Sequence, residues 1–572
     1  MAWDRGNKRP AEMNKTDSEA HRTAHDGLRT GDTVADQSQQ RARRHRIFPP
    51  PKDLQAWRLL QQRRRLQFWR AALVGLVAGG VAMLFQRALR WAEGLRFELL
   101  AYLHAAHPLW GWLVLPVVTG GIGALIGWLT ARTCPDAAGS GIPNVKGVLA
   151  QTETMSWKRL LPVKFFGGMA CIGSGFSMGR EGPTVQMGAA VGQAVGGILR
   201  VPAHARPHLI ACGAGAGLSA AFNAPLAGFI FTIEELQREF STLTYGTALI
   251  AAVVADIVTR SFMGHAPAFS VTGYATPPLT ELPLFALVGL AAGLLGVAFN
   301  VAILWSKRQS DRHVGLRPWQ RAGLIGVLVG LVGWFLPEVL GTGHHVAEQV
   351  LRGDYASFDM VGFLALLFVG KFTLTVLSYL AGVPGGIFAP MLLLGAVIGL
   401  AVGQMGFFLF PDLAQTPAAF AVAGMAAYFS AVVRAPLTGI VLVLEMTHNY
   451  EQLLPLLVAC MIAYLVADHL KIRPIYDALL QYSLEQSTSA APTTAEPTLQ
   501  ELVVEPESFM DGCAIRDLGL PEGCLVVTIT RSQQEIIPHG DTVLAAGDRI
   551  TVVVSGRQGR AYEQLHTLSR AP

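Results

Sequence analysis

The segment Gly179-Arg180-Glu181-Gly182-Pro183 lies inside one of the most apolar stretches of the chain. An ionised carboxylate at membrane depth costs about 2.5–3.5 kcal/mol, so such a residue usually belongs to an ion or proton path. The flanking glycines free the backbone, and Pro183 suits the first turn of a helix. Because free N–H groups at a helix start bind anions, the segment predicts an anion site together with a titratable competitor, Glu181. The alternative is a structural carboxylate paired with Arg180.

This segment has a counterpart later in the chain, Gly386-Ile387-Phe388-Ala389-Pro390, which also opens an apolar helix with a Gly and a Pro. A second pair of segments, Gly213 to Glu234 and Gly424 to Glu445, matches at one fixed offset. Both contain Ser-Ala, then Ala-Pro-Leu, and both end on Glu. The chain therefore contains two duplicated halves that each contribute a helix N-terminus to a shared site. Inversion of the halves is common in transporter folds of this kind.

The composition is that of a polytopic membrane protein. Hydrophobic residues make up 51% of the 572 residues and charged residues only 15%, against about 25% charged in globular proteins. Several apolar segments are too short to cross a bilayer alone, which favours an all-α fold of tilted and re-entrant helices. The apolar segments are 68–90, 111–131, 159–172, 184–199, 207–219, 224–236, 245–263, 283–305, 321–340, 360–381, 388–409, 417–430, 436–446 and 452–467.

The ends of the chain differ from this apolar body. Residues 1–50 are polar and basic, without periodicity, and are predicted to be a disordered tail. Arginines cluster just before the first apolar run, which predicts a cytoplasmic N-terminus and fits a juxtamembrane position better than nucleic-acid binding. Residues 53–66 have the pattern of an interfacial helix. The tail could also plug the cytoplasmic vestibule.

The C-terminal part is predicted to be a separate soluble domain. After a membrane domain over 51–482, residues 483–498 are rich in Ser, Thr, Ala and Pro and are predicted to be a linker. A small α/β domain then occupies 499–572, with strand-forming runs at Leu525–Ile529 and Ile550–Val554 and a closing helix at 560–569. No nucleophile–base pair and no metal-ligand spacing among the cysteines is seen, so we expect neither an enzyme nor a metal or other cofactor.

Three further segments could hold an anion. Ser140, in Gly139-Ser140-Gly141-Ile142-Pro143, offers a hydroxyl at a glycine-freed helix start, although a helix N-cap is the alternative. The backbone amides of Ile387 and Phe388 could cap an anion without formal charge, although a glycine bend before a core helix is as good an explanation. Tyr476, just beyond the last apolar run, could donate a phenolic hydrogen bond or could be an interfacial tyrosine.

Three charged residues inside the apolar body remain. Glu234 and Glu235 close an apolar helix, where a single Glu would be solvated and two together favour a proton relay. Lys164 could tune the local field or extend its amine to the interface.

The motifs GSGIP, GREGP and GGIFAP, followed by the late tyrosine, resemble those of the CLC chloride channel and chloride/proton antiporter family over about Leu66 to Leu480. The resemblance implies two inverted repeats and a homodimer with a separate anion pathway in each subunit. It implies that Ser140 and Tyr476 bind the central chloride through their side chains, and Ile387 and Phe388 through their amides. Glu181 matches the external gating glutamate and Glu235 the internal proton-transfer glutamate.

A glutamate at 235 is typical of antiporters of this family, so the resemblance implies chloride/proton exchange across the inner membrane. A passive chloride channel and a ligand-responsive membrane sensor with a vestigial pore are the alternatives. One departure is Asn144, where a Glu often follows the GSGIP proline. Residues 515–548 resemble the RCK/TrkA C-terminal module, which implies a cytoplasmic regulatory domain that binds a small molecule or dimerises.

Overall fold

The structure, a computed structural model, describes residues 54–107, 109–238, 242–264, 268–269, 277–313, 315–411, 417–490, 498–531, 534–554, 564–565 and 568–569. The chain divides into two units, Met1–Arg63 and Arg64–Pro572. In the first unit only the start of one helix is described, so the predicted tail over 1–50 lies outside the described residues.

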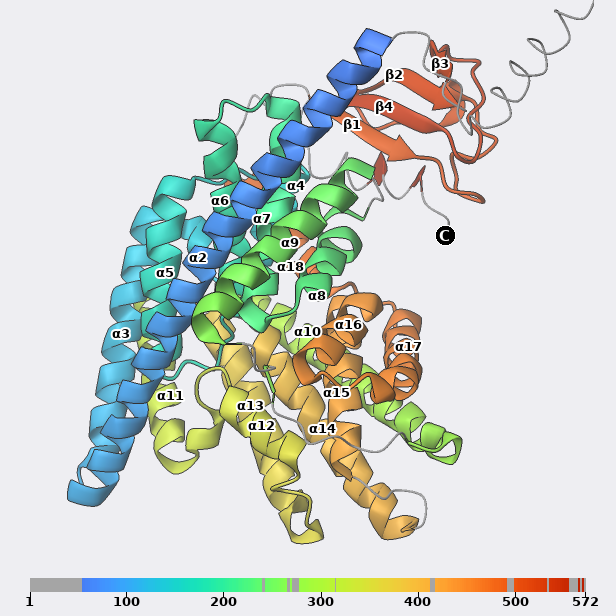
Figure 1. The fold of residues 1–572 in the computed structure, drawn as a ribbon. Coiled ribbons are helices and arrows are strands. Elements are labelled where there is room, and N and C mark those ends of the chain that lie inside the picture. Colours follow the sequence, from blue (N-terminus) through green and yellow to red (C-terminus); the bar gives the residue numbers. More distant parts are fainter. Residues whose placement is uncertain are drawn as a thin grey trace, which may run out of the picture. The chain divides into compact units, whose positions relative to one another are not determined.

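The body of the second unit is built from α-helices (Figure 1). Every apolar segment expected from the sequence is helical, and seven helices are long and apolar enough to cross a membrane. The all-α polytopic fold is therefore confirmed. The helices are α2 (Leu54–Ala106), α3 (Gly111–Thr133), α4 (Ile142–Leu149), α5 (Trp157–Ser174), α6 (Glu181–Ile198), α7 (Arg206–Phe222), α8 (Pro225–Phe231), α9 (Thr242–Met263), α10 (Leu282–His313), α11 (Pro318–Phe335), α12 (His344–Arg352), α13 (Val361–Leu380), α14 (Phe388–Leu409), α15 (Pro417–Val433), α16 (Pro436–Thr447), α17 (Leu453–His469) and α18 (Ile475–Ala490).

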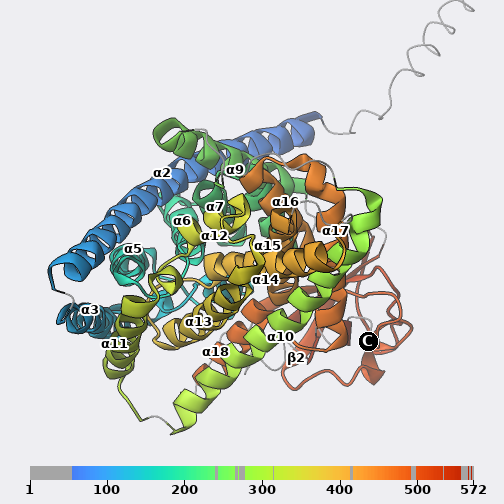
Figure 2. The same cartoon turned by 90° about the horizontal axis from the view of Figure 1, so that it is seen from below.

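The order of these helices repeats along the chain. A long helix, α3 or α11, is followed by a short one, α4 or α12, and the series then runs from α5 to α9 in the first half and from α13 to α17 in the second. Equivalent helices pack alike: α6 lies on α7 as α14 lies on α15, and α3 and α11 run side by side in both views (Figures 1 and 2). The duplication predicted from the sequence thus extends over the whole membrane body.

Two buried lysines occupy equivalent places in the two halves. Lys164 on α5 donates from Nζ to the carbonyls of Ala137 (2.9 Å) and Gly139 (2.7 Å). Lys371 on α13 donates to the carbonyls of Val339 (3.1 Å) and Gly341 (2.8 Å). Both side chains are fully buried, so an interfacial amine at Lys164 is wrong. Each lysine fixes the loop that leads into a short helix, α4 or α12.

Two glutamates cap each other's repeat. Glu445, near the end of α16, accepts the N–H groups of Leu226 (3.1 Å) and Ala227 (2.8 Å) at the start of α8. Glu234, in the π-helical turn Thr232–Gln237 that follows α8, accepts those of Leu437 (3.1 Å) and Thr438 (2.7 Å) at the start of α16. Each carboxylate satisfies N–H groups that have no partner inside their own helix. Capping of α16 is therefore an alternative to the proton-relay role expected for Glu234.

The C-terminal part forms an antiparallel sheet in the order β1–β4–β2–β3. Its strands are β1 (Thr498–Val503), β2 (Cys524–Arg531), β3 (Gln534–Ile536) and β4 (Arg549–Val554). The strand-forming runs found in the sequence lie in β2 and β4, and Ile529, Ile550 and Val552 are fully buried in a separate core. The sequence missed β1, whose Thr498 was assigned to the linker. Most of the predicted helix at 560–569 lies outside the described residues.

The linker predicted over 483–498 begins too early. The helix α18 continues to Ala490, because polar side chains on it bind the membrane body. Ser483 donates to Glu153 (2.8 Å), and Gln486 donates to Asp311 (2.6 Å). These contacts stabilise a helix that a Ser- and Thr-rich composition does not favour by itself.

Candidate functional site

Ser140 lies in the loop directly before α4. Gly141, the N-cap residue of α4, has a φ of 84°, a left-handed conformation that glycine adopts without strain. The Ser140 side chain is fully buried, and its Oγ has no hydrogen-bond partner among the described residues. A buried hydroxyl without a partner is costly, so this donor is available for a ligand.

Tyr476, near the start of α18, comes from the last helix of the membrane body and lies next to Ser140. Its side chain is fully buried, and in the described part of the chain its hydroxyl too has no hydrogen-bond partner. The hydroxyls of Tyr476 and Ser140 are neighbours without the geometry of a hydrogen bond. Two inward hydroxyls in a closed apolar region can each donate a hydrogen bond to an anion.

Glu181 is the first residue of α6, and its side chain is only 2% exposed. Its Oε2 accepts the N–H of Ala389 in the first turn of α14 (3.2 Å). Its Oε1 lies 3.7 Å from Nε of Arg180. Arg180 precedes α6 as its N-cap, so the neighbours do not point apart as they would within a helix. The pairing that the sequence offered as an alternative exists, but it leaves Oε2 bound to the second repeat.

The predicted amide ligands begin the same helix. Ile387 is the N-cap residue of α14 and Phe388 its first residue, and both are fully buried. Their N–H groups have no acceptor within α14, because the first turn of a helix lacks one. The Glu181 carboxylate therefore rests at a helix N-terminus, where a negative charge is stabilised.

A close approach of backbones brings these elements together. A Cβ placed on Gly182 would collide with Ser140 Oγ, and one placed on Gly386 would lie 3.1 Å from the nitrogen of Gly182. The glycines next to Glu181 therefore allow the starts of α6 and α14 to meet at the Ser140 loop. Ser140 thus lies against Gly182 beside Glu181, and Tyr476 neighbours Ser140. Glu181 in turn binds the first turn of α14, which Ile387 and Phe388 begin.

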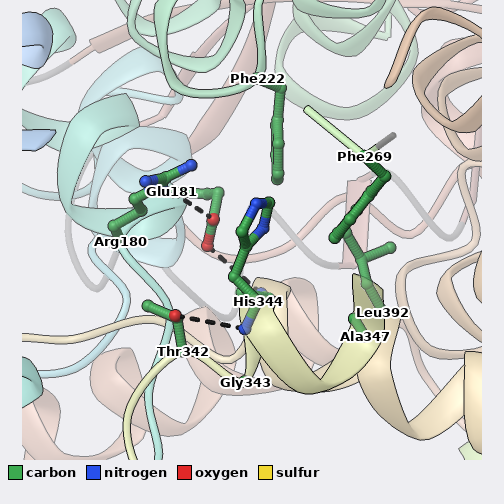
Figure 3. Close-up of a pocket in the computed structure, with 10 residues that line it drawn as sticks. Arg180, Glu181, Phe222, Phe269, Thr342, Gly343, His344, Ala347 and Leu392 are labelled. Carbon is green, nitrogen blue, oxygen red and sulfur yellow. Dashed lines mark hydrogen bonds and ion pairs between the residues drawn. The ribbon is translucent and has the colours of Figure 1, made fainter. Parts of the chain in front are cut away.

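A cavity lies beside the Glu181 carboxylate (Figure 3). His344, the first residue of α12, stands between Glu181 and Phe269 and stacks on the Phe269 ring with centroids 4.5 Å apart. Thr342 holds the start of α12, since its Oγ1 accepts the N–H of His344 (3.4 Å). The sequence analysis did not predict that Thr342 and His344 line this cavity, because the segment at 341–345 lacks the apolar pattern of its equivalent at 139–143. The cavity is lined by Arg180, Glu181, Phe222, Phe269, Thr342, Gly343, His344, Ala347, Ala389 and Leu392.

Glu235 lies in a separate cluster of charges. It belongs to the π-helical turn after α8, a distortion often found at functional sites, and it is 1% exposed. Its Oε1 accepts from Nζ of Lys146 on α4 (2.7 Å). Lys146 also contacts Oδ1 of Asp477, and Arg238 contacts Oδ2 of the same residue. The sequence did not single out Lys146, Asp477 or Arg238, although a lysine inside a short apolar helix was a signal.

Asn144, the departure from the family pattern, does not face the anion ligands. Its amide donates to Glu153 (2.7 Å), and its oxygen accepts from Gln186 on α6 (3.0 Å). It ties α4 to neighbouring segments. Within the described residues there is no group of three or more side chains suited to a metal ion.

Comparisons with known proteins assign two parts of the chain to known families. Residues 122–468 match the voltage gated chloride channel family, and residues 499–566 match the TrkA-C domain. The H(+)/Cl(-) exchange transporter ClcA of Vibrio parahaemolyticus is 42% identical over 426 residues, which cover 73% of this chain and 89% of that protein. The chain belongs to the voltage gated chloride channel (CLC) family.

Other CLC proteins are similar over the same region. The H(+)/Cl(-) exchange transporter ClcA of Salmonella arizonae is 39% identical over 436 residues, covering 75% of this chain and 91% of that protein. The crystal structure of a slow cyanobacterial Cl-/H+ antiporter has a TM-score of 0.70 and 37% identity, covering 74% of this chain and 99% of that one. The CLC fold and the C-terminal TrkA-C domain expected from the sequence are thus confirmed.

Proposed function

We propose that this CLC protein is a secondary active antiporter that exchanges chloride for protons. The observation that carries the proposal is the position of the Glu181 carboxylate. It accepts the Ala389 N–H next to the amides of Ile387 and Phe388 at the start of α14. A carboxylate that occupies an anion site competes with chloride for it. Because protonation removes that competition, anion binding and proton binding become linked. The names of the relatives support exchange over a passive channel.

Chloride binds between the two halves of the protein in this account. The hydroxyls of Ser140 and Tyr476, which lack partners within the described chain, donate from one side, and the Ile387 and Phe388 amides donate from the other. None of these ligands carries a full charge. Dipolar ligands of this kind hold an anion while letting it leave, as transport requires.

Glu181 carries the proton at the outer side. When it is protonated it gives up the α14 amide and moves into the adjoining cavity, whose walls include His344 and Phe269. Chloride then takes the vacated amide. When the carboxyl loses its proton outward, the carboxylate returns and displaces chloride inward.

Glu235 supplies protons from the cytoplasmic side. It is buried, in contact with other charged groups, and close enough to Tyr476 to act on it electrostatically. In this account Glu235 is the titratable group on the inner side of the anion ligands. No catalytic activity and no cofactor form part of the proposal.

The membrane body is a multi-pass unit, and we assign it to the inner membrane with both termini in the cytoplasm, as the basic cluster before the first span indicates. It functions as a homodimer. The helices α8 and α16 are too short to span a bilayer, and Leu226 and Leu437 at their starts are 48% and 55% exposed. The exposed apolar side chains at these helix starts support the packing of a second copy on this face.

The C-terminal TrkA-C domain senses a small-molecule ligand. Its core and sheet are its own, which fits a folded regulatory module. Deletion of residues 499–572 from the otherwise complete chain should remove any effect of that ligand on transport while leaving exchange intact.

Flux from proteoliposomes tests the exchange proposal. Chloride and external pH are recorded together for the wild type and for Glu181→Ala. We expect chloride-driven proton movement in the wild type and none in the variant. Chloride flux without proton movement in the wild type would mean a channel.

A further inference from the structure

We propose that Lys146 is a positioning residue that sets when Glu235 takes up a proton and ties this event to the elements that carry Ser140 and Tyr476. The inference rests on the proposed exchange function and deepens it. Lys146 lies outside the GSGIP, GREGP and GGIFAP motifs.

The contact between Lys146 and Glu235 is a buried ion pair. The Lys146 Nζ lies 2.7 Å from Oε1 of Glu235, with side chains 8% and 1% exposed. Since salt screens buried pairs much less than exposed ones, the lysine strongly favours the ionised form of this carboxyl. The pair therefore opposes proton uptake by Glu235.

Asp477 makes this arrangement reversible. Lys146 also contacts Oδ1 of Asp477, so the lysine is shared between two carboxylates. When Glu235 becomes neutral, Lys146 keeps Asp477 as its partner. A buried charge left without any partner is strongly destabilising. The cluster thus lets Glu235 lose its charge without leaving Lys146 unpaired.

The same pair connects the proton site to the anion ligands. Lys146 lies on α4, whose start follows the Ser140 loop, and Asp477 directly follows Tyr476 on α18. A change in the balance between the two carboxylates pulls on both elements. Proton uptake at Glu235 therefore affects the position of the side-chain hydroxyls that bind chloride.

The remaining charged groups near Glu235 support this assignment. Arg238, at the end of the same turn, contacts Asp477, while α8, packed against the turn, has no ionisable side chain. The other ionisable groups near this turn are Glu234 on the turn itself, Tyr476 on α18, and Arg206, His208 and Cys212 on α7.

The test measures proton and chloride flux of the full chain in proteoliposomes over a series of cytoplasmic-side pH values. Lys146→Met removes the charge and keeps the length of the side chain. We expect it to retain chloride flux and to move the half-maximal pH of proton flux upward by about 1–3 units, the range for loss of one close opposite charge. Lys146→Arg is the matched control and should restore the wild-type profile.

Asp477→Asn is a second variant, and we expect it to shift the half-maximal pH of proton flux in the opposite direction. Without Asp477, both Lys146 and Arg238 act on Glu235 alone, so the half-maximal pH should fall by about one unit. A purely structural role for the cluster would lower both fluxes of both variants without opposite pH shifts. This second measurement remains decisive if Lys146→Met does not fold.

The outcomes separate this inference from the proposed function. An unchanged pH profile in folded Lys146→Met, or shifts of equal sign in the two variants, would overturn the role of Lys146 while exchange by the wild type stands. Wild-type chloride flux without proton flux would overturn both. In Glu235→Gln, an added Lys146→Met should leave the pH dependence of the remaining chloride flux unchanged, and a shift would count against the inference.

Discussion

Gly179 and Gly386 bind each other through two reciprocal backbone hydrogen bonds. The N–H of Gly179 donates to the carbonyl of Gly386 (2.6 Å), and the N–H of Gly386 donates to that of Gly179 (2.8 Å). These residues are equivalent in the two halves, because Gly179 precedes α6 and Gly386 precedes α14. The starts of these two helices form part of the proposed anion site. Reciprocal bonds between equivalent residues place a local two-fold axis at this point.

The same symmetry relates other pairs of residues. Glu234 and Glu445 cap each other's repeat, and Lys164 and Lys371 hold equivalent loops. An antiparallel pairing at the axis is what two inverted repeats require. The proposed anion site thus lies where the repeats meet, and each half contributes one helix start.

Removal of the Glu181 charge should strengthen chloride binding. In the wild type, chloride must displace a carboxylate from the Ala389 N–H, and one charge-assisted hydrogen bond is worth about 1.5–3 kcal/mol. We expect Glu181→Gln to bind chloride about tenfold more tightly in calorimetry at neutral pH. Glu98→Gln, which neutralises an exposed carboxylate on α2, is the control. Equal affinities in Glu181→Gln and wild type would show that the carboxylate does not compete.

Loss of either hydroxyl should weaken chloride binding. Ser140→Ala and Tyr476→Phe each remove a buried donor that finds no partner elsewhere in the described chain. A hydrogen bond to a charged group is worth about 1.5–3 kcal/mol, so affinity should fall by about ten- to a hundredfold in each variant. Thr133→Ala, whose exposed hydroxyl donates only to its own helix, serves as the control. An unchanged chloride affinity in both hydroxyl variants would remove these residues from the anion site.

Neutralisation of Glu235 should separate the two fluxes. Glu235→Gln keeps the shape of a buried side chain and removes its ability to bind and release a proton. Proteoliposomes with this variant should still show chloride flux, because Glu181 still responds to outside pH. Proton flux should fall to background, because the inner proton carrier is lost. Persistent proton transport at the wild-type rate would count against Glu235 as the inner proton carrier.

The two capping glutamates should affect stability rather than coupling. Glu234→Ala and Glu445→Ala each leave two helix-start N–H groups without their acceptor. Loss of a helix cap costs about 0.5–2 kcal/mol. Both variants should therefore lower the midpoint of thermal unfolding in detergent by similar amounts. Loss of proton flux by Glu234→Ala at unchanged stability would instead support the relay role that the sequence suggested.

The C-terminal domain should lose stability in acid. Hydrogen bonds from Arg531 hold the pKa of Asp548 below its usual range, against the effect of burial. A carboxyl whose folded pKa is lowered stabilises the domain above its unfolded pKa of about 3.9, and this contribution is lost as pH falls through the folded value. The hydrogen-exchange protection factors of β2 and β4 in the full chain should fall on acidification, and Asp548→Asn should flatten this dependence. Equal pH dependence in both proteins would contradict the ion pair's role.

Much of this fold is visible in the sequence because membrane helices are apolar and the repeat keeps its spacing. The motifs around Ser140, Glu181 and Phe388 also predicted where helix starts meet, since Gly and Pro mark such starts. The short helix α12 was missed because His344 and His345 replace the apolar residues that mark its equivalent, α4.

Long-range ion pairs could not be predicted in the same way. Lys146 and Glu235 are far apart in the sequence, and only the packing of α4 against the turn after α8 brings them together. Glu234 and Glu235 look alike as neighbours in the chain. The structure separates them, because the π-helical turn directs one carboxylate to α16 and the other to Lys146.

Proton movement driven by a chloride gradient tests the central claim most directly. Wild-type protein in proteoliposomes is given a chloride gradient and no initial pH gradient, and Glu181→Ala is measured beside it. The account predicts that chloride flow drives protons in the opposite direction, creates a pH difference in the wild type, and creates none in Glu181→Ala. Chloride flow with no pH change in the wild type, or an equal pH change in both proteins, would contradict it.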